Sequence, residues 1–314
     1  MDARKKITVL GGGIMGSGIS LALALSDQNI IIRDLNEAII NNTLKTIQNI
    51  LGTLDEMNII PLGKSETTLN NIKGMTNLKE AVAEADFVIE VIPEKMDLKK
   101  KLFRQLDKIC PQHTIFASNT STFRITEMSQ STRREDRFIG THWMNPPYLL
   151  PLVEVIPGEK TSSKTIEKTI MLLKQGNKSP IICKDKPGFL INRLHTVLLV
   201  EAISMLEKGL ASAEDIDLIW TKHLGLRYPI MGPLQQIDTF GLDTELSQYS
   251  YLYEKLGEEK FKPPDLLRKM VESGQLGLKT KKGFYDYNKR DIADLIKQRD
   301  KQLVELMRTL KLLQ

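Results

Sequence analysis

The sequence of 314 residues predicts an α/β fold, in which a doubly wound, mostly parallel sheet is followed by an all-α C-terminal domain. Three observations lead to this prediction. A glycine-rich segment at 11–18 separates a strand-like stretch from a helical one. Strand-like segments then alternate with helical ones, the order expected of a parallel sheet. After the turn signal Asp185-Lys186-Pro187-Gly188, strand character fades and the pattern is helical.

The composition is that of an ordinary globular protein, with 41% hydrophobic and 26% charged residues. This length predicts two domains and a sizeable core. The formal charge is +5, and the mixing of both signs along the chain argues against nucleic-acid binding. No apolar run approaches the length of a membrane span, and the N-terminus leads into a strand rather than a signal peptide.

Two cysteines, Cys110 and Cys183, are the whole thiol content of the chain. They do not have the spacing of zinc ligands, and they indicate a reducing compartment rather than a disulfide framework. We therefore expect a cytoplasmic protein without a metal site and without a membrane partner.

The first predicted strand, Lys6–Leu10, is followed by Gly11-Gly12-Gly13-Ile14-Met15-Gly16 and then by a helix. This is the G-x-G-x-x-G motif of a Rossmann dinucleotide site in its required context. Gly11 permits a tight turn, Gly13 lets the backbone approach a pyrophosphate, and Gly16 allows close helix–strand packing. The phosphates are expected at the helix N-terminus, where N–H groups and the helix dipole favour anions.

Asp34 ends the second predicted strand, eighteen positions beyond the last glycine of the motif. Its carboxylate is expected to bind the ribose hydroxyls and to repel a 2′-phosphate, which favours NAD over NADP. The predicted cofactor-binding residues from this part of the chain are Gly11, Gly13, Ile14, Met15, Gly16 and Asp34.

Residues 36–72 are predicted to be helical, with an interruption at Pro61-Leu62-Gly63, so a helical hairpin near 45–72 is expected to project from the sheet. Further strands are predicted at Ala85–Ile92, Thr114–Ser118, Phe138–Trp143, Leu152–Ile156 and Pro180–Cys183. Ligands bind beyond the carboxyl ends of such strands. Polar residues fall at several of these ends: Glu90, Glu94, Ser118-Asn119-Thr120-Ser121 and His142. Any one of them alone is more commonly a cap or a loop residue.

His142 closes one predicted strand, and Glu154 lies twelve residues later in the next. A histidine takes or returns a proton near neutral pH, and a carboxylate fixes its tautomer and stabilises the imidazolium. A purely structural hydrogen bond is the other interpretation of the pair. The dinucleotide motif favours the catalytic one.

We place the domain boundary near Lys184. Residues 1–184 are expected to bind the cofactor, and 185–287 to supply substrate contacts and a homodimer interface, by analogy with other dehydrogenases. Residues 288–314 are predicted to form an amphipathic helical tail, packed on its own subunit or on a second one. Its apolar residues recur with a heptad-like spacing: Ile292, Ile296, Leu303, Leu306, Leu310 and Leu313. Acidic residues among the basic ones disfavour a membrane-surface helix.

Taken together, these motifs resemble the 3-hydroxyacyl-CoA dehydrogenase family over about residues 6–287. The resemblance is carried, in matching order and spacing, by 10–16, 85–94, 117–121, 142–146, 152–155, 184–189 with Asn192-Arg193, and 277–285. It implies an NAD-dependent enzyme of fatty acid metabolism, with His142 as the catalytic base and Glu154 as its orienting carboxylate. Ser121 and Asn192 would contact the reacting oxygen of the substrate.

The same resemblance assigns further cofactor contacts. Glu94 and Lys99, expected one helical turn apart, would line the nicotinamide-ribose side of the site. Ser121, Asn145 and Lys279 also match cofactor-contacting positions of the family.

The departures from the family pattern lie on the substrate side. Pro151 stands where members acting on CoA thioesters often have a lysine, and Pro146-Pro147 and Leu226–Pro233 resemble relatives that oxidise L-carnitine, L-gulonate or other small non-CoA substrates such as diketones. Arg227 is either a partner for a substrate carboxylate or a surface residue.

An L-3-hydroxyacyl-CoA is therefore the expected substrate, and a free hydroxy acid is the alternative. A cofactor-binding structural protein, comparable to the crystallins recruited from this family, is disfavoured by the intact set of Ser121, His142, Glu154 and Asn192.

Overall fold

Eight strands form a single sheet within residues 4–313, the part of the chain that the computed structural model describes. They are β1 (Lys6–Leu10), β2 (Asn29–Arg33), β3 (Ile72–Met75), β4 (Phe87–Glu90), β5 (Ile115–Ser118), β6 (Phe138–Trp143), β7 (Leu152–Pro157) and β8 (Ser179–Ile182). Their spatial order is β3-β2-β1-β4-β5-β6-β7-β8, and every pair of neighbours is parallel except β6 and β7. The predicted mostly parallel sheet is confirmed.

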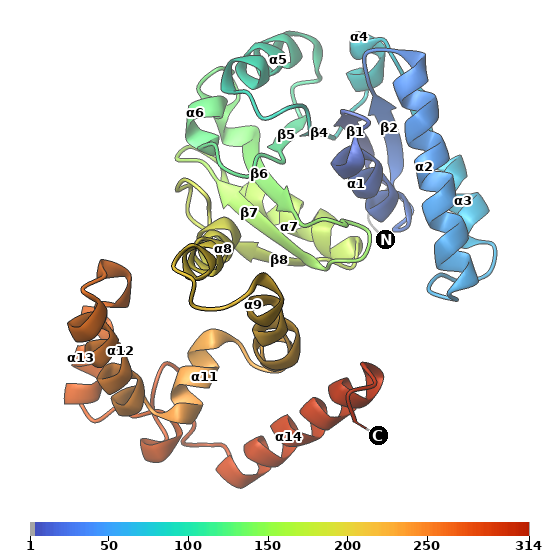
Figure 1. Cartoon of the computed structure of the whole chain (residues 1–314). Helices are drawn as coiled ribbons and strands as arrows, with labels where there is room; N and C mark the ends of the chain where they lie inside the picture. Colours follow the sequence, from blue (N-terminus) through green and yellow to red (C-terminus); the bar gives the residue numbers. More distant parts are fainter. Residues whose placement is uncertain (1–3, 314) are drawn as a thin grey trace. The chain divides into compact units, whose positions relative to one another are not determined.

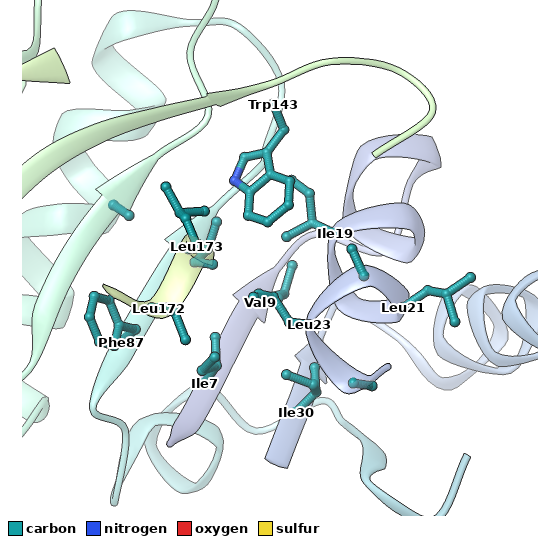
Figure 2. Close-up of a cluster of buried hydrophobic side chains, with 14 of the residues drawn as sticks. Ile7, Val9, Ile19, Leu21, Leu23, Ile30, Phe87, Trp143, Leu172 and Leu173 are labelled. Atoms are coloured by element: carbon teal, nitrogen blue, oxygen red, sulfur yellow. The ribbon is translucent and has the colours of Figure 1, made fainter. Parts of the chain in front are cut away.

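Helices cover both faces of the sheet, as a doubly wound fold requires (Figure 1). On one face lie α1 (Ile14–Ala24), α2 (Glu37–Glu56) and α7 (Ser163–Gln175). Figure 2 shows the core on this face, where Val9 of β1 lies among Ile19, Leu23 and Leu173. These side chains meet because alternate residues of a strand point to the same face.

The opposite face carries α4 (Leu78–Val82), α5 (Met96–Ile109) and α6 (Ile125–Ser129). Three fully buried aromatic rings form the centre of this second core. Phe103 of α5 packs edge-on against Phe138 of β6, with ring centres 4.5 Å apart, and Phe116 of β5 lies beside both. Two cores of this kind hold the sheet rigid beneath the loops at its carboxyl edge.

The segment predicted as helical over 36–72 contains α2, α3 (Lys64–Asn70) and, at its end, the start of β3. Asn36 begins α2 with a side-chain hydrogen bond from Ile39 N (3.0 Å). The turn before α3 includes Gly63 with φ 76°, a left-handed conformation that suits glycine. The helical prediction was wrong for Ile72, and the strand β3, which pairs with β2 at the edge of the sheet, was not predicted.

The order of strands reverses between β1 and β4, which are neighbours in space but not in sequence. Crevices beyond the carboxyl ends of strands at such a point are the usual ligand sites of open α/β sheets. The glycine-rich loop follows β1, and the segment that contains Glu94 follows β4. The topology therefore brings these two segments to one edge.

The chain consists of two compact units that meet in the sequence between Leu199 and Val200, within α8 (Ile191–Glu207). The second unit is helical, with α9 (Ala213–Ile219), α10 (Gly225–Arg227), α11 (Pro233–Phe240), α12 (Leu242–Leu256), α13 (Asp265–Glu272) and α14 (Ile292–Thr309). Its small core includes Leu242, Leu267 and Met270. No helix within residues 4–313 combines the length and apolar character needed to cross a bilayer.

A buried aspartate anchors the turn that follows α13. Asp238 of α11 accepts hydrogen bonds from Phe284 N (2.9 Å), Tyr285 N (3.0 Å) and the Tyr287 hydroxyl (2.9 Å). A Cβ at Gly283 would lie 2.0 Å from the carboxylate of Asp238, so glycine is needed for this close approach. The 277–285 motif is thus held by Asp238, and this contact accounts for the glycine at position 283.

Candidate active site

The glycine-rich loop turns sharply from β1 into α1. Gly11 has φ 118°, and its N–H donates to Arg33 O (2.9 Å). A Cβ at Gly16 would lie 1.8 Å from Gly11 O, so the start of α1 packs directly on the turn. Gly13 is the N-cap of α1 and has nothing within 4 Å of its Cβ position. Open space at the N-terminus of a helix is what a pyrophosphate requires.

Asp34 lies at the carboxyl end of β2, beside the glycine-rich loop. Its Oδ2 accepts from Gly12 N (2.6 Å) and its Oδ1 from Leu35 N (2.6 Å). Thr43 of α2 donates to Gly12 O (2.7 Å) and fixes the loop from the other side. The donors of the helix N-terminus, the open space at Gly13 and the placed carboxylate together fit a dinucleotide.

His142 and Glu154 lie directly opposite each other on β6 and β7, the one antiparallel pair of the sheet. Side chains of directly opposed residues lie on the same face of such a pair, which turns a spacing of twelve residues into a contact. His142 Nδ1 is 2.7 Å from Glu154 Oε2. Both side chains are buried.

The second carboxylate oxygen of Glu154 accepts hydrogen bonds from backbone N–H groups at the N-terminus of α8. Its Oε1 accepts from Leu190 N (2.8 Å) and Ile191 N (3.0 Å). Burial is the largest influence and would raise the pKa of Glu154. The hydrogen bonds from His142 and from these two N–H groups outweigh burial and hold the pKa below its usual value. Glu154 is therefore ionised at neutral pH.

An ionised carboxylate only accepts hydrogen bonds, so Nδ1 of His142 carries a hydrogen, and in the neutral imidazole the free lone pair is then on Nε2. This tautomer follows from the hydrogen-bond network. The ring of Phe189 lies 5.8 Å from the imidazole, centre to centre. The arrangement can accept a proton at Nε2 while Glu154 stabilises the resulting imidazolium.

Ser121 and Asn192 are brought together by the start of α8. Asn192 Nδ2 donates to Ser121 O at 2.8 Å. Ser121 lies in the turn after β5, and Asn192 follows Ile191, whose N–H binds Glu154. One helix terminus thus connects the His142–Glu154 pair with both residues proposed to contact the substrate oxygen.

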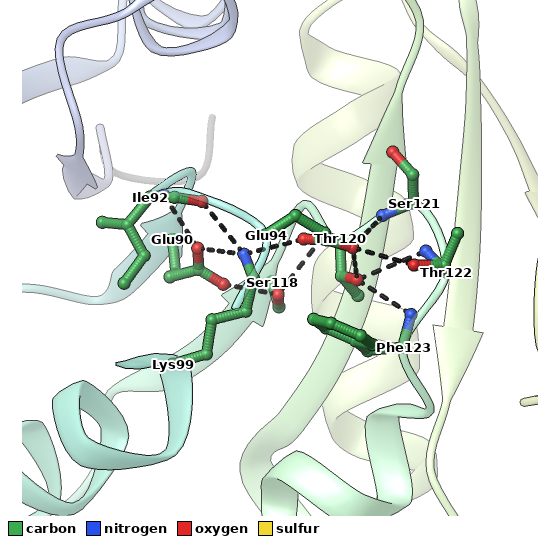
Figure 3. Close-up of polar contacts among 9 residues, drawn as sticks. All are labelled: Glu90, Ile92, Glu94, Lys99, Ser118, Thr120, Ser121, Thr122 and Phe123. Atoms are coloured by element: carbon green, nitrogen blue, oxygen red, sulfur yellow. Dashed lines mark hydrogen bonds and ion pairs between the residues drawn. The ribbon is translucent and has the colours of Figure 1, made fainter. Parts of the chain in front are cut away.

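Glu94 and Lys99 meet, but not as two positions on one helix. Glu94 precedes α5, so the expected separation of one helical turn was wrong, and the contact instead crosses the N-terminus of that helix. Lys99 Nζ is 3.2 Å from Glu94 Oε2 and 2.6 Å from Glu90 Oε1 (Figure 3). Glu94 Oε1 accepts from Ser121 N at 3.2 Å. Burial opposes the ionisation of Glu94, but Thr120 and Lys99 hold its pKa below the usual value.

Asn145 is exposed in the loop that joins β6 to β7. A buried lysine that was not predicted holds this loop: Lys178 Nζ donates to Pro147 O (2.6 Å) and Leu150 O (3.1 Å). Burial lowers the pKa of Lys178. No pattern in the sequence marks Lys178, because its two partners are backbone carbonyls about thirty residues away.

Lys279 and Arg227 belong to the second unit. Lys279 Nζ binds both carboxylate oxygens of Asp243, at 2.8 and 3.0 Å. The Arg227 guanidinium lies 5.4 Å from the centre of the Phe240 ring. Arg227 and Phe240 line a cavity of about 170 Å³, together with Arg299 and Leu303 of the tail helix α14.

Comparison with known proteins gives two matches to family models. Residues 6–186 match the NAD binding domain of 3-hydroxyacyl-CoA dehydrogenase, and residues 188–287 match the C-terminal domain of the same family. The cofactor of the N-terminal part is thus NAD. Residues 288–314, which include all of α14, lie beyond both models.

Individual relatives extend this likeness. The chain is 40% identical over 286 residues to a probable 3-hydroxybutyryl-CoA dehydrogenase of Bacillus subtilis, which covers 91% of this chain and 98% of the relative. A crystal structure of a 3-hydroxyacyl-CoA dehydrogenase from Archaeoglobus fulgidus is similar with a TM-score of 0.82 and 34% identity, covering 99% of this chain and 100% of that one.

A more distant solved structure also includes the tail. It is a 5-formyl-3-hydroxy-2-methylpyridine-4-carboxylic acid 5-dehydrogenase, described as an NAD+-dependent dismutase. The TM-score is 0.73 at 28% identity, covering 98% of this chain and 99% of that one.

Proposed function

Because the chain belongs to the 3-hydroxyacyl-CoA dehydrogenase family, we propose that it oxidises an L-3-hydroxyacyl-CoA to the 3-oxoacyl-CoA with NAD and catalyses the reverse reduction. One observation carries the proposal. The His142–Glu154 pair is buried and leaves Nε2 of the imidazole without a partner among residues 4–313. A base held in one tautomer is the group that oxidation of a hydroxyl requires.

In this proposal each residue of the site has a separate task. The side chains of Ser121 and Asn192 hold the hydroxyl oxygen of the substrate, and His142 Nε2 takes its proton. Glu154 stabilises the imidazolium through the bond of 2.7 Å to Nδ1. NAD, when bound, supplies the acceptor for the hydride that leaves C3. Asp34, the glycine-rich loop, Ile14, Met15, Glu94, Asn145 and Lys279 are proposed to orient the cofactor, and Lys99 is considered below.

A thioester of CoA also needs a place for its nucleotide tail. We propose the hairpin of α2 and α3, which contains Lys45 and Lys64, together with Lys73 of the following strand β3. Lys64 is paired with Asp27 at 2.9 Å, which leaves Lys45 and Lys73 as the better candidates for phosphate contacts. Fatty acid metabolism and a cytoplasmic location are proposed with this substrate, the latter because Cys110 and Cys183 are free thiols.

Replacement of His142 by glutamine tests the proposed base. We expect His142→Gln to lower kcat by about 10²–10⁴-fold, the usual contribution of a general base. NADH affinity, measured by fluorescence titration, should stay nearly unchanged, because β6 is separated from β1 by β4 and β5. His113→Gln is the matched control, since that side chain is 59% exposed and far from β6 in the sequence. A fully active His142→Gln enzyme would refute the assignment.

A free hydroxy acid is the second candidate, and three observations favour it. α2 ends with Asp55 and Glu56, which repel a phosphate. Arg227 forms no ion pair within residues 4–313 and is suited to a carboxylate. One solved structure that spans nearly the whole chain is named as the dehydrogenase of a pyridine carboxylic acid, a substrate without CoA, although the 3-hydroxyacyl-CoA dehydrogenase from Archaeoglobus fulgidus spans it as well. The sequence departures at Pro151 and Leu226–Pro233 point the same way.

We further propose that the enzyme is a homodimer formed through its helical domain. α8 is rich in apolar residues, yet none of its side chains is buried. Val197, Val200 and Ile203 are 64%, 59% and 66% exposed. An apolar surface of this kind is typical of a subunit interface. For function we retain the division into a cofactor-binding part (1–184), a substrate and dimerisation part (185–287) and a tail (288–314).

A further inference from the structure

A fully buried carboxylate ends β4 directly beneath the proposed site. Glu90 Oε1 accepts from Lys99 Nζ (2.6 Å) and Ile92 N (2.8 Å), and its Oε2 accepts from the Ser118 hydroxyl (2.6 Å). Glu90 lies in register with Leu10 of β1 on one side and Ser118 of β5 on the other. It therefore sits at the level where the glycine-rich loop leaves the sheet.

Lys99 uses all its donors inside the protein. An ammonium group has three N–H bonds, and Lys99 Nζ has three acceptors: Glu90 Oε1, Ile92 O (3.2 Å) and Glu94 Oε2 (3.2 Å). Its side chain is 1% exposed. A cofactor atom would have to displace one of these partners to reach it, so direct contact with the cofactor is a poor explanation for this lysine.

Glu94 connects Lys99 to the turn after β5 through its two carboxylate oxygens (Figure 3). While Oε2 faces Lys99, Oε1 accepts from Ser121 N (3.2 Å) and from the hydroxyls of Thr122 (3.2 Å) and Thr120. The carboxylate is thus fixed at both oxygens. The turn that it holds is the one that presents Ser121 and receives Asn192.

The segment between Glu90 and Glu94 also contacts the cofactor loop. A Cβ at Gly11 would lie 3.0 Å from Val91 O, so the two backbones are as close as glycine permits. A shift of this segment would therefore be felt both at the glycine-rich loop and at the Ser121 turn. Buried charged groups in such a place need their partners, because an unpaired buried charge is strongly unfavourable.

We propose that Glu90 and Lys99 are positioning residues. Glu90 orients the Lys99 ammonium, Lys99 orients Glu94, and Glu94 holds the Ser121 turn at the geometry that the reaction needs. The chain of contacts rests on the proposed function only in its last member, the role of Ser121 toward the substrate. The family resemblance assigns Lys99 to the cofactor, and this arrangement assigns it to the protein instead.

Glu90→Gln is the central test, since it replaces the carboxyl group by an amide of nearly the same shape. We expect kcat to fall by up to about 10²-fold, the scale for a small misplacement in an active site. The Kd of NADH should change by a smaller factor than kcat, because the glycine-rich loop and Asp34 keep their own contacts. Lys99→Met should act in the same way. Lys100→Met is the matched control on the same helix, because Lys100 pairs, among residues 4–313, only with the partly exposed Glu127 (2.7 Å). Its kcat should equal that of the unaltered enzyme.

A double-mutant cycle separates positioning from general loss of stability. If Glu90 acts through Glu94, the pair Glu90→Gln/Glu94→Gln should be no slower than Glu94→Gln alone. Additive losses of kcat would overturn the proposal. So would a Glu90→Gln enzyme that loses NADH affinity but keeps kcat, because Lys99 would then serve cofactor binding.

Hydrogen exchange of the peptide spanning 119–124 provides a readout that needs no substrate. Exchange should be faster in Glu90→Gln than in Lys100→Met, because Ser121 N loses a fixed acceptor. Equal exchange would refute the positioning role even if the substrate is not an acyl-CoA. If Glu90→Gln fails to fold, Ser118→Ala is the second variant. It removes the hydrogen bond to Glu90 and the longer one from Thr120 N (3.3 Å), so exchange should again be faster, and no effect would count against the proposal.

Discussion

At the scale of single residues, Asp34 is expected to decide the choice of cofactor. Its carboxylate is held by Gly12 N and Leu35 N at the end of β2, where a ribose 2′-phosphate would meet its charge. Asp34→Ala should reduce the preference for NAD over NADP, measured as the ratio of kcat/KM values. The loss of charged hydrogen bonds predicts a reduction of about 1.5–3 kcal/mol, or roughly 10–100-fold. Equal kcat/KM for both cofactors in the unaltered enzyme would show that Asp34 has another role.

Glu154 should make stability depend on pH. Its pKa is lowered in the folded protein because His142 and two N–H groups outweigh the effect of burial. The unfolded chain then binds more protons over the acidic range, so the stabilisation is complete above the usual glutamate pKa of about 4.3 and is lost as the pH falls through the lower folded value. Urea unfolding at several pH values should show a steeper acid loss for the unaltered protein than for Glu154→Gln. Parallel curves would contradict the account.

At the scale of elements, two glycines at the start of α1 have different roles: Gly16 is needed for packing, and Gly13 is proposed to be needed for cofactor binding. Gly16→Ala places a Cβ 1.8 Å from Gly11 O, and such overpacking should lower the free energy of unfolding by about 1–3 kcal/mol or more. Gly13→Ala meets no protein atom within 4 Å, so stability should be retained while NADH binding weakens. Thermal unfolding and NADH titration of both variants provide the measurement. The account fails at this point if Gly13→Ala binds NADH normally.

Much of this architecture could be predicted because its signals are local. The glycine motif, the alternation of strands and helices and the strand of His142 all depend on neighbouring residues. β3 escaped prediction because Ile72-Lys73-Gly74-Met75 is short, carries a lysine and a glycine, and gains its pairing only from β2. Of its side chains only Ile72 is buried.

The support of the site was harder to predict than the site itself. Glu90 and Ser118 were noticed as polar residues at strand ends, but their contact depends on β4 and β5 being neighbours in register. Lys178 and Asp238 bind backbone groups that are distant in sequence, so no spacing announces them. The types of residue were enough to indicate the chemistry of the site. The contacts that support it could be found only once the order of the strands was known.

At the scale of the whole molecule, the exposed apolar face of α8 predicts a dimer. Ile203→Asp puts a charge on a side chain that is 66% exposed in one chain, and it should convert the dimer to a monomer in sedimentation experiments. Leu62→Asp is the control, since that side chain is fully exposed and lies between α2 and α3, away from α8 in the sequence. An unaltered enzyme that sediments as a monomer would rule out the interface.

The nature of the substrate is the central claim, and a comparison of acetoacetyl-CoA with acetoacetate, both reduced by NADH, tests it most directly. If the enzyme recognises the CoA group, the binding energy of that remote group helps to stabilise the transition state at the reacting carbon. The account then predicts a far higher kcat/KM for acetoacetyl-CoA and unchanged kinetics in Arg227→Ala. The contradictory result is a poor CoA ester, a better free acid, and an Arg227→Ala enzyme whose KM for that acid rises by the equivalent of about 1.5–3 kcal/mol.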